Sequence, residues 1–168
     1  MQLHGQIHSF PKEVKILILA FLIMLAMGYT TGLLFVSNTN SNTPNGMVEN
    51  YLGNEDDDEA LEMKFKKSDR EMLSILHTHI LSTSFIFFFL GALLALTSLQ
   101  KKLKTFLMLE PFLSIVLTFG GIYLMWKGIL WMKIIVMISG IVMTAVFYIG
   151  TLLLIIQLFK KPEITNKL

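Results

Sequence analysis

The stretch that decides the fold is IIVMISGIVMTAVFYIGTLLLIIQLF, residues 134–159, which contains no charged side chain. A transmembrane helix needs about 20 consecutive apolar residues. This stretch is longer than that, and it lies between Lys133 and Lys160. It therefore predicts a helix that crosses a lipid bilayer, with a lysine at each border.

Three further stretches of the same kind precede it, and a long polar connection, residues 37–70, separates the first two. The apolar core of the first is uncharged, the second carries only two histidines as titratable groups, and the third carries only Glu110. The four predicted spans cover approximately residues 14–36, 71–99, 105–126 and 131–159. We therefore predict an all-α integral membrane protein, a four-transmembrane-helix bundle that forms a single domain over residues 1–168.

The composition supports a membrane protein and excludes other classes. Hydrophobic residues make up 54% of the chain and charged residues 15%, and the mean hydropathy is +0.63. A soluble domain of this size cannot bury so much apolar surface, so a soluble enzyme and a disordered protein are excluded. The net charge of +2 is too small for a nucleic-acid binder. The absence of cysteine excludes disulfides and thiolate metal sites, and we predict no metal site.

Lysine and arginine set the expected orientation, because they favour the cytoplasmic side of a membrane. With four spans, both termini and the middle connection share one side, where eight of these residues lie: Lys12, Lys15, Lys101, Lys102, Lys104, Lys160, Lys161 and Lys167. The remaining six are Lys64, Lys66, Lys67, Arg70, Lys127 and Lys133. We therefore expect a bacterial inner-membrane protein with both termini in the cytoplasm and the loop 37–70 outside.

Small residues are candidates for helix packing, because lipid supplies no hydrophobic drive for helix association and close approach of the backbones matters. The first span contains Gly-Tyr-Thr-Thr-Gly, a GxxxG pattern. The packing candidates across the four spans are Gly28, Gly32, Ser84, Gly91, Gly120, Gly121 and Gly140. The alternative is that a glycine leaves room for a cofactor or a lipid.

His77 and His79 open the second span and are the main cofactor-binding candidates. Ionisable residues inside a span are costly and are functional candidates by default. A spacing of two residues turns a helix by about 200°, so the pair does not share one face. Four readings stay open: a structural histidine bonded to Tyr29 or a loop carbonyl, a haem b ligand, proton or quinone chemistry at the outer face, and copper binding.

Glu110 is the second candidate group, and Pro111 follows it near the cytoplasmic end of the third span. A glutamate close to a helix N-terminus is stabilised by the helix dipole, and proline is tolerated there. We therefore expect a helix-start device with Lys104 as partner. The alternative is a carboxylate that handles protons.

The outer loop contains one segment that is more apolar than its surroundings, Gly46 to Gly53, which includes Tyr51. It predicts a short amphipathic element on the outer membrane face that covers the His77 end of the bundle. The acidic run 55–59 lacks the spacing of a calcium loop and predicts a solvated charge run. Tyr123, Trp126 and Trp131 predict an aromatic belt at the outer interface.

Several of these segments together resemble a group of small four-helix bacterial inner-membrane proteins. The resemblance covers about residues 28–98 and rests on the Gly-Tyr-Thr-Thr-Gly-Leu run, the segment Gly46 to Gly53, the approach Met63 to Ser68 and the His77-x-His79 pair. No activity is assigned to that group, so the resemblance implies none. It does imply that the outer loop and the histidines belong to one site.

The sequence contains no nucleotide motif and no nucleophile–base set. The leading hypothesis is a small non-catalytic subunit of a larger membrane complex, of the respiratory or electron-transfer kind, or a homo-oligomer. A haem b protein that uses His77 or His79 is the second hypothesis. A transporter or enzyme acting at the outer face is the third.

Overall fold

The computed structural model describes residues 7–55 and 62–160, and these residues form five α-helices and one short 3-10 turn. In chain order, the elements are η1 (Ile7–Ser9), α1 (Lys12–Asn38), α2 (Pro44–Leu52), α3 (Asp69–Ala95), α4 (Lys101–Trp126) and α5 (Met132–Phe159). By length and composition, α1, α3, α4 and α5 can each cross a membrane. The predicted all-helical architecture with four spans is confirmed.

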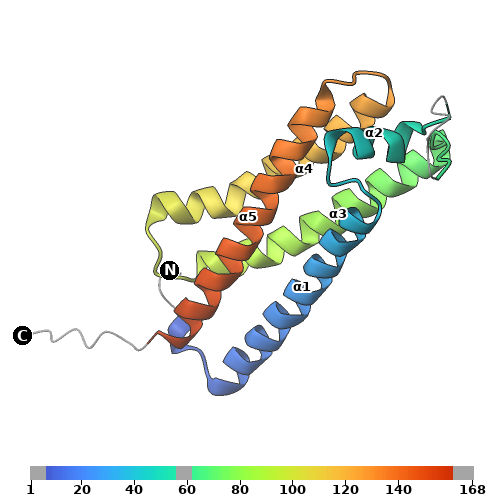
Figure 1. Cartoon of the computed structure of the whole chain (residues 1–168). Coiled ribbons are helices and arrows are strands. Elements are labelled where there is room, and N and C mark those ends of the chain that lie inside the picture. Colours follow the sequence, from blue (N-terminus) through green and yellow to red (C-terminus); the bar gives the residue numbers. More distant parts are fainter. Residues whose placement is uncertain (1–6, 56–61, 161–168) are drawn as a thin grey trace, which may run out of the picture.

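The bundle is built around the antiparallel pair α4 and α5, which share the most extensive helix contact. α3 packs mainly on α4, whereas α1 lies at the edge of the bundle and contacts α5 (Figure 1). η1 contacts α5 near the end where α1 starts and α5 finishes. α2 packs on α4 and α5 at the opposite end. The two ends of the bundle are called the η1 end and the α2 end below.

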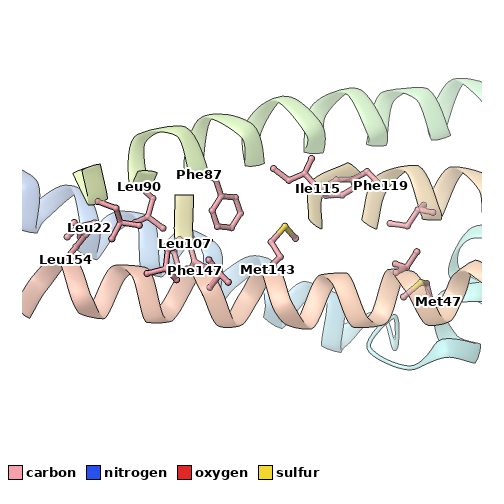
Figure 2. Packing of buried hydrophobic residues seen from close by; sticks show 14 of the residues in the cluster. Leu22, Met47, Phe87, Leu90, Leu107, Ile115, Phe119, Met143, Phe147 and Leu154 are labelled. Carbon is pink, nitrogen blue, oxygen red and sulfur yellow. The ribbon is translucent and has the colours of Figure 1, made fainter. Parts of the chain in front are cut away.

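The apolar core runs along α5 as one continuous row. Figure 2 shows it from Leu22 and Leu154 at the η1 end to Phe119 and Met47 at the α2 end. Outside this row the spans carry apolar side chains on the surface, and Val116, for example, is 67% exposed. A helix that is apolar on all sides is typical of a membrane span, so lipid is the expected partner of these outer faces.

The connection between α3 and α4 lies four residues earlier in the chain than expected, because α4 begins at Lys101 rather than at residue 105. α3 ends at Ala95, before residue 99. The Lys104 ammonium donates hydrogen bonds to the carbonyl oxygens of Ala95 (3.2 Å) and Thr97 (2.8 Å). A lysine has an apolar stem and a charged tip. Lys104 can therefore lie within α4 while its ammonium donates hydrogen bonds to carbonyl groups at the end of α3.

The apolar segment of the long loop is helical, as expected, and becomes α2. The Thr43 hydroxyl accepts a hydrogen bond from the Gly46 amide at 3.1 Å and caps the helix start. Gly53 ends the helix with φ +85°, and a Cβ there would lie 2.8 Å from the Lys64 carbonyl oxygen. Only glycine fits both conditions. The predicted solvated acidic run falls largely on residues 56–61, outside the described residues.

Candidate functional site

A polar cluster lies inside the bundle where α1 meets α5, and Tyr29 is its first member. The Tyr29 ring stacks on Phe147, with centroids 3.9 Å apart and an angle of 9° between the planes. Its hydroxyl shares a hydrogen bond of 3.2 Å with Thr144. The edge of the Phe87 ring from α3 lies beside it, at a centroid distance of 6.4 Å. Tyr29 therefore ties α1 to the centre of the α3–α5 core.

A second hydroxyl pair lies next to the first. Thr30 and Tyr148 share a hydrogen bond of 2.7 Å, and the Thr30 hydroxyl also donates to the Ala26 carbonyl at 2.7 Å. Both residues of this pair are exposed at the bundle surface. Two adjacent hydroxyl pairs thus connect α1 to α5, and they lead from the surface of the bundle toward its interior.

Glu110 is not a helix-start device. α4 begins at Lys101, so Glu110 lies about 13 Å along the helix from its start, at 1.5 Å per residue. The dipole effect is confined to the first turn, and Lys104 donates to the end of α3. Instead, the Ser114 hydroxyl donates to Glu110 Oε1. The other oxygen, Oε2, is buried and has no hydrogen-bond partner among the described residues.

The register of α4 and α5 places Glu110 at the level of the hydroxyl pairs. Thr118 and Ser139 share a buried hydrogen bond of 2.7 Å across the two helices. Because the helices are antiparallel, a step of eight residues back along α4 corresponds to eight residues forward along α5. Glu110 is therefore level with Phe147, the residue on which Tyr29 stacks. Tyr29 also lies within electrostatic reach of Glu110.

The same level contains a second unpartnered group. Thr151 Oγ1 is buried without a hydrogen-bond partner among the described residues. It follows Phe147 by one helical turn, about 6 Å along the axis. Pro111, which directly follows Glu110 inside α4, has no N–H to donate to the Leu107 carbonyl. Three polar groups thus lack their usual hydrogen-bond partners within one or two helical turns. They are Glu110 Oε2, Thr151 Oγ1 and the Leu107 carbonyl oxygen.

The two histidines lie elsewhere, near the α2 end of α3, and both are exposed. His79 Nδ1 lies 2.9 Å from the Ile75 carbonyl oxygen. A carbonyl can only accept, so Nδ1 carries the proton in this bond and Nε2 is left as an acceptor. The His79 ring lies beside Phe119 at a centroid distance of 5.5 Å. The described residues contain no cluster of three or more groups suited to a metal ion.

The predicted packing residues divide into two groups, and Gly91 and Gly121 form the first. Both are buried. A Cβ at Gly121 would lie 2.7 Å from Val136 Cγ2, and a Cβ at Gly91 would lie 3.8 Å from Met108 Cγ. These two glycines lie where α4 approaches α5 and α3.

The second group faces away from the bundle. A Cβ at Gly28, Gly32, Gly120 or Gly140 would meet no described atom within 4 Å. These four glycines therefore do not hold described helices of one chain together, because their side-chain directions point outward. Ser84 is half-buried. The GxxxG pattern of α1 stays a prediction for contact with a second chain.

The α2 end is closed by aromatic and basic residues. Trp126 is only 4% exposed, and its Nε1 donates to the Lys67 carbonyl at 2.9 Å. It therefore supports the loop and is not an interfacial belt residue, unlike Trp131, which is 64% exposed. Burial raises the pKa of the Tyr51 phenol above its ordinary value, so this side chain is a neutral packing group.

The sequence reasoning did not bring the hydroxyl groups of the cluster together. Glu110, Ser114 and Thr118 are spaced by four residues, which places them on one face of a helix. That spacing could have identified the polar face of α4. Nothing in the sequence pairs it with Tyr29, because this contact joins helices that are far apart in the chain.

A helical bundle with four apolar spans and an internal polar cluster defines a multi-pass membrane protein. Residues 41–165 match the Aq_1264_TM family, a family of transmembrane helical domains, and the chain belongs to this family. The match begins after α1 and covers α2 to α5. It agrees with the expected resemblance at the level of a transmembrane helical family. No curated protein and no solved structure matches the chain.

Proposed function

We propose that the protein is a small non-catalytic accessory subunit of a larger bacterial membrane complex, of the respiratory or electron-transfer kind. The observation that carries this proposal is the position of α1. It lies at the edge of the bundle and contacts mainly α5, and it precedes the part of the chain that matches the family. An edge helix with so few internal contacts is well placed to bind another chain.

The free face of α1 has the chemistry of a helix–helix interface. Gly28 and Gly32 are exposed, and a Cβ at either position would meet no described atom within 4 Å. Met24 and Phe35, on the same side of the helix by spacing, are 65% and 68% exposed. A GxxxG pattern lets two helix backbones approach closely, so this face suits a helix of a partner chain.

The test is purification from the native membrane in mild detergent, with the wild type compared with Gly32→Leu. We expect the wild type to elute with larger subunits and the Gly32→Leu variant to elute alone, because a leucine keeps the partner helix at a distance. Gly120→Leu is the matched control: this glycine is also exposed and faces open space, but it lies on α4. A wild-type protein that elutes as a lone monomer would contradict the proposal.

A haem b protein is the second candidate, and the His79 hydrogen bond favours it. A histidine that ligates a metal commonly donates its other ring N–H to a backbone carbonyl, and His79 Nδ1 makes such a contact with Ile75. Because His79 is exposed, a haem bound there would lie outside the bundle, against a partner chain. A visible spectrum of protein made with ample haem tests this: a Soret band that His79→Ala removes is expected.

His77→Ala serves as the matched control for the haem experiment, since His77 is exposed on the same helix and sits two residues away. A wild-type spectrum without a Soret band would eliminate the haem candidate. That result would leave the accessory-subunit proposal unaffected, because the α1 interface does not depend on a cofactor.

A further inference from the structure

We propose that the start of α3 binds one anionic phospholipid of the bilayer leaflet at the α2 end, with the lipid phosphate held by Lys67, Arg70 and Ser74. These residues line an open cavity of about 320 Å³ together with Glu71 and Ile75. That volume is in the range of small-molecule sites, about 300–1,000 Å³. The proposal does not rest on the accessory-subunit function, because the cavity is at the start of α3 and the proposed partner contact is on α1.

The first argument concerns the cations of the cavity. Lys67 is half-buried and Arg70 is exposed, and neither forms an ion pair with another described residue. The exposed Ser74 hydroxyl lies beside them in the lining. An arginine guanidinium matches the geometry of a phosphate group, and a serine hydroxyl can donate a further hydrogen bond. The cavity therefore presents two cations and one hydroxyl donor to an anion.

The second argument concerns the carboxylate that also lines the cavity, Glu71. Its Oε2 accepts hydrogen bonds from the Ser68 amide at 2.8 Å and from the Ser68 hydroxyl at 2.7 Å, so this group is engaged in capping α3. It also lies within electrostatic reach of Lys67. The lining nevertheless keeps two cations against one carboxylate. Its net positive charge complements the negative charge of a lipid phosphate.

The third argument concerns depth. The Lys67 carbonyl accepts a hydrogen bond of 2.9 Å from Trp126 Nε1, which holds the start of α3 beside the end of α4. From Ser74 to its end at Ala95, α3 extends about 30 Å at 1.5 Å per residue. The hydrocarbon core of a bilayer is also about 30 Å thick. When Ala95 lies at one border of this core, Ser74 lies at the other, and the cavity is at the depth of the lipid headgroups.

The fourth argument selects a lipid over a free anion. Leu81 and Phe85 follow Ser74 by seven and eleven residues, which places all three on one side of the helix. Leu81 is 47% exposed and Phe85 is 61% exposed. At 1.5 Å per residue they lie about 10 Å and about 16 Å from Ser74, and one leaflet of the core is about 15 Å deep. An acyl chain can therefore lie along this apolar stripe while its phosphate occupies the cavity.

The test is native mass spectrometry of the full-length protein, stripped of lipid in detergent and titrated with dioleoyl phosphatidylglycerol or dioleoyl phosphatidylcholine. The two lipids have the same chains and differ in net charge. We expect the wild type to bind one phosphatidylglycerol more tightly than phosphatidylcholine. Each cation near a membrane surface strengthens the attraction of anionic lipid by about fivefold. The double variant Lys67→Gln/Arg70→Gln is therefore expected to bind phosphatidylglycerol about 25-fold more weakly.

The double variant Lys64→Gln/Lys66→Gln is the matched control. It removes the same charge from the same connection between α2 and α3, but neither lysine lines the cavity. We expect it to bind phosphatidylglycerol almost as tightly as the wild type. An equal loss of affinity in both double variants, or no loss in Lys67→Gln/Arg70→Gln, would overturn the proposal, because the lipid would then not be held by the cavity.

The wild type alone also decides the proposal, so the outcome does not depend on the folding of a variant. Equal affinity for the two lipids overturns it, because the cavity would then not select an anion. Glycerol 3-phosphate, which has the phosphate but no acyl chains, is expected not to displace bound phosphatidylglycerol at equal concentration. Displacement under that condition would show that the cavity takes a free anion rather than a lipid, and it would overturn the proposal equally.

Discussion

Gly120 and Gly121 are neighbours in α4 with opposite surroundings. A Cβ at Gly121 would lie 2.7 Å from Val136 Cγ2, whereas a Cβ at Gly120 would meet no described atom within 4 Å. Valine is stiff about its first side-chain bond, so Val136 cannot rotate away at low cost. The two positions form a natural matched pair for measuring how closely α4 and α5 pack.

We expect Gly121→Ala to lower the free energy of unfolding by about 1–3 kcal/mol, the usual cost of overpacking a core. Gly120→Ala is expected to leave stability unchanged or raise it slightly, because alanine is the better helix former. Thermal unfolding of both variants in the same detergent measures the difference. Equal melting temperatures would show that the α4–α5 contact is looser than the structure indicates.

Lys104 is 9% exposed and satisfies the carbonyl oxygens of Ala95 and Thr97. We expect Lys104→Met to keep the apolar stem but to destabilise the protein by about 1–3 kcal/mol, because buried acceptors lose their donor. Lys102→Met is the control and should have little effect, because Lys102 is exposed and lies two residues away, on the other side of the helix. Denaturant unfolding followed by circular dichroism provides the measurement.

At the scale of the element, α1 depends on a few polar contacts. Its hydroxyl pairs with α5 are Tyr29–Thr144 and Thr30–Tyr148. Hydrogen bonds between transmembrane helices contribute about 0.6 kcal/mol on average and about 1.7 at most. The attachment of α1 to the bundle is therefore weak enough for single substitutions to be informative.

A double-mutant cycle with Tyr29→Phe and Thr144→Val isolates one of these contacts. Tyr29→Phe keeps the ring that stacks on Phe147 and removes only the hydroxyl. We expect the two substitutions to be non-additive, with a coupling of about 0.5–1.7 kcal/mol. The readout is unfolding in detergent. Additive effects would mean that the 3.2 Å contact does not hold α1 in place.

The elements also show what the sequence could and could not predict. The four spans follow from hydropathy alone, because a soluble domain cannot bury four apolar runs of about 20 residues or more. The ends of α3 and α4 were misplaced, because a lysine such as Lys104 ends an apolar stretch without ending a helix. The helix-start role of Glu110 failed for the same reason: moving the start of α4 to Lys101 leaves Glu110 deep in the span.

The partners of the cluster could not be predicted, since they depend on how distant helices are rotated. Tyr29 and Thr144 are separated by 115 positions in the chain, and no local pattern fixes that pairing. The same applies to Gly28 and Gly32: the GxxxG pattern is visible in the sequence, but only the structure shows that this face is turned outward.

At the scale of the whole molecule, the orientation in the membrane is open to direct test. The chain has no cysteine, so single-cysteine variants report one position each. We expect Glu55→Cys, at the α2 end, to react with a membrane-impermeant maleimide in intact cells, because the lysine distribution places this end outside. We expect Lys102→Cys, at the opposite end, to react only after permeabilisation. The reverse pattern would invert the topology.

The position of α1 also has a consequence for biosynthesis. α1 leaves the ribosome before the other three described spans, yet the hydroxyl partners of Tyr29 and Thr30 are on α5, the last of the four to be made. α4 packs extensively on α3 and on α5, so these three spans can assemble as soon as they are inserted. α1 must wait in the bilayer until α5 has been made, and during this interval its glycine face and its two hydroxyl groups are available to any neighbouring chain.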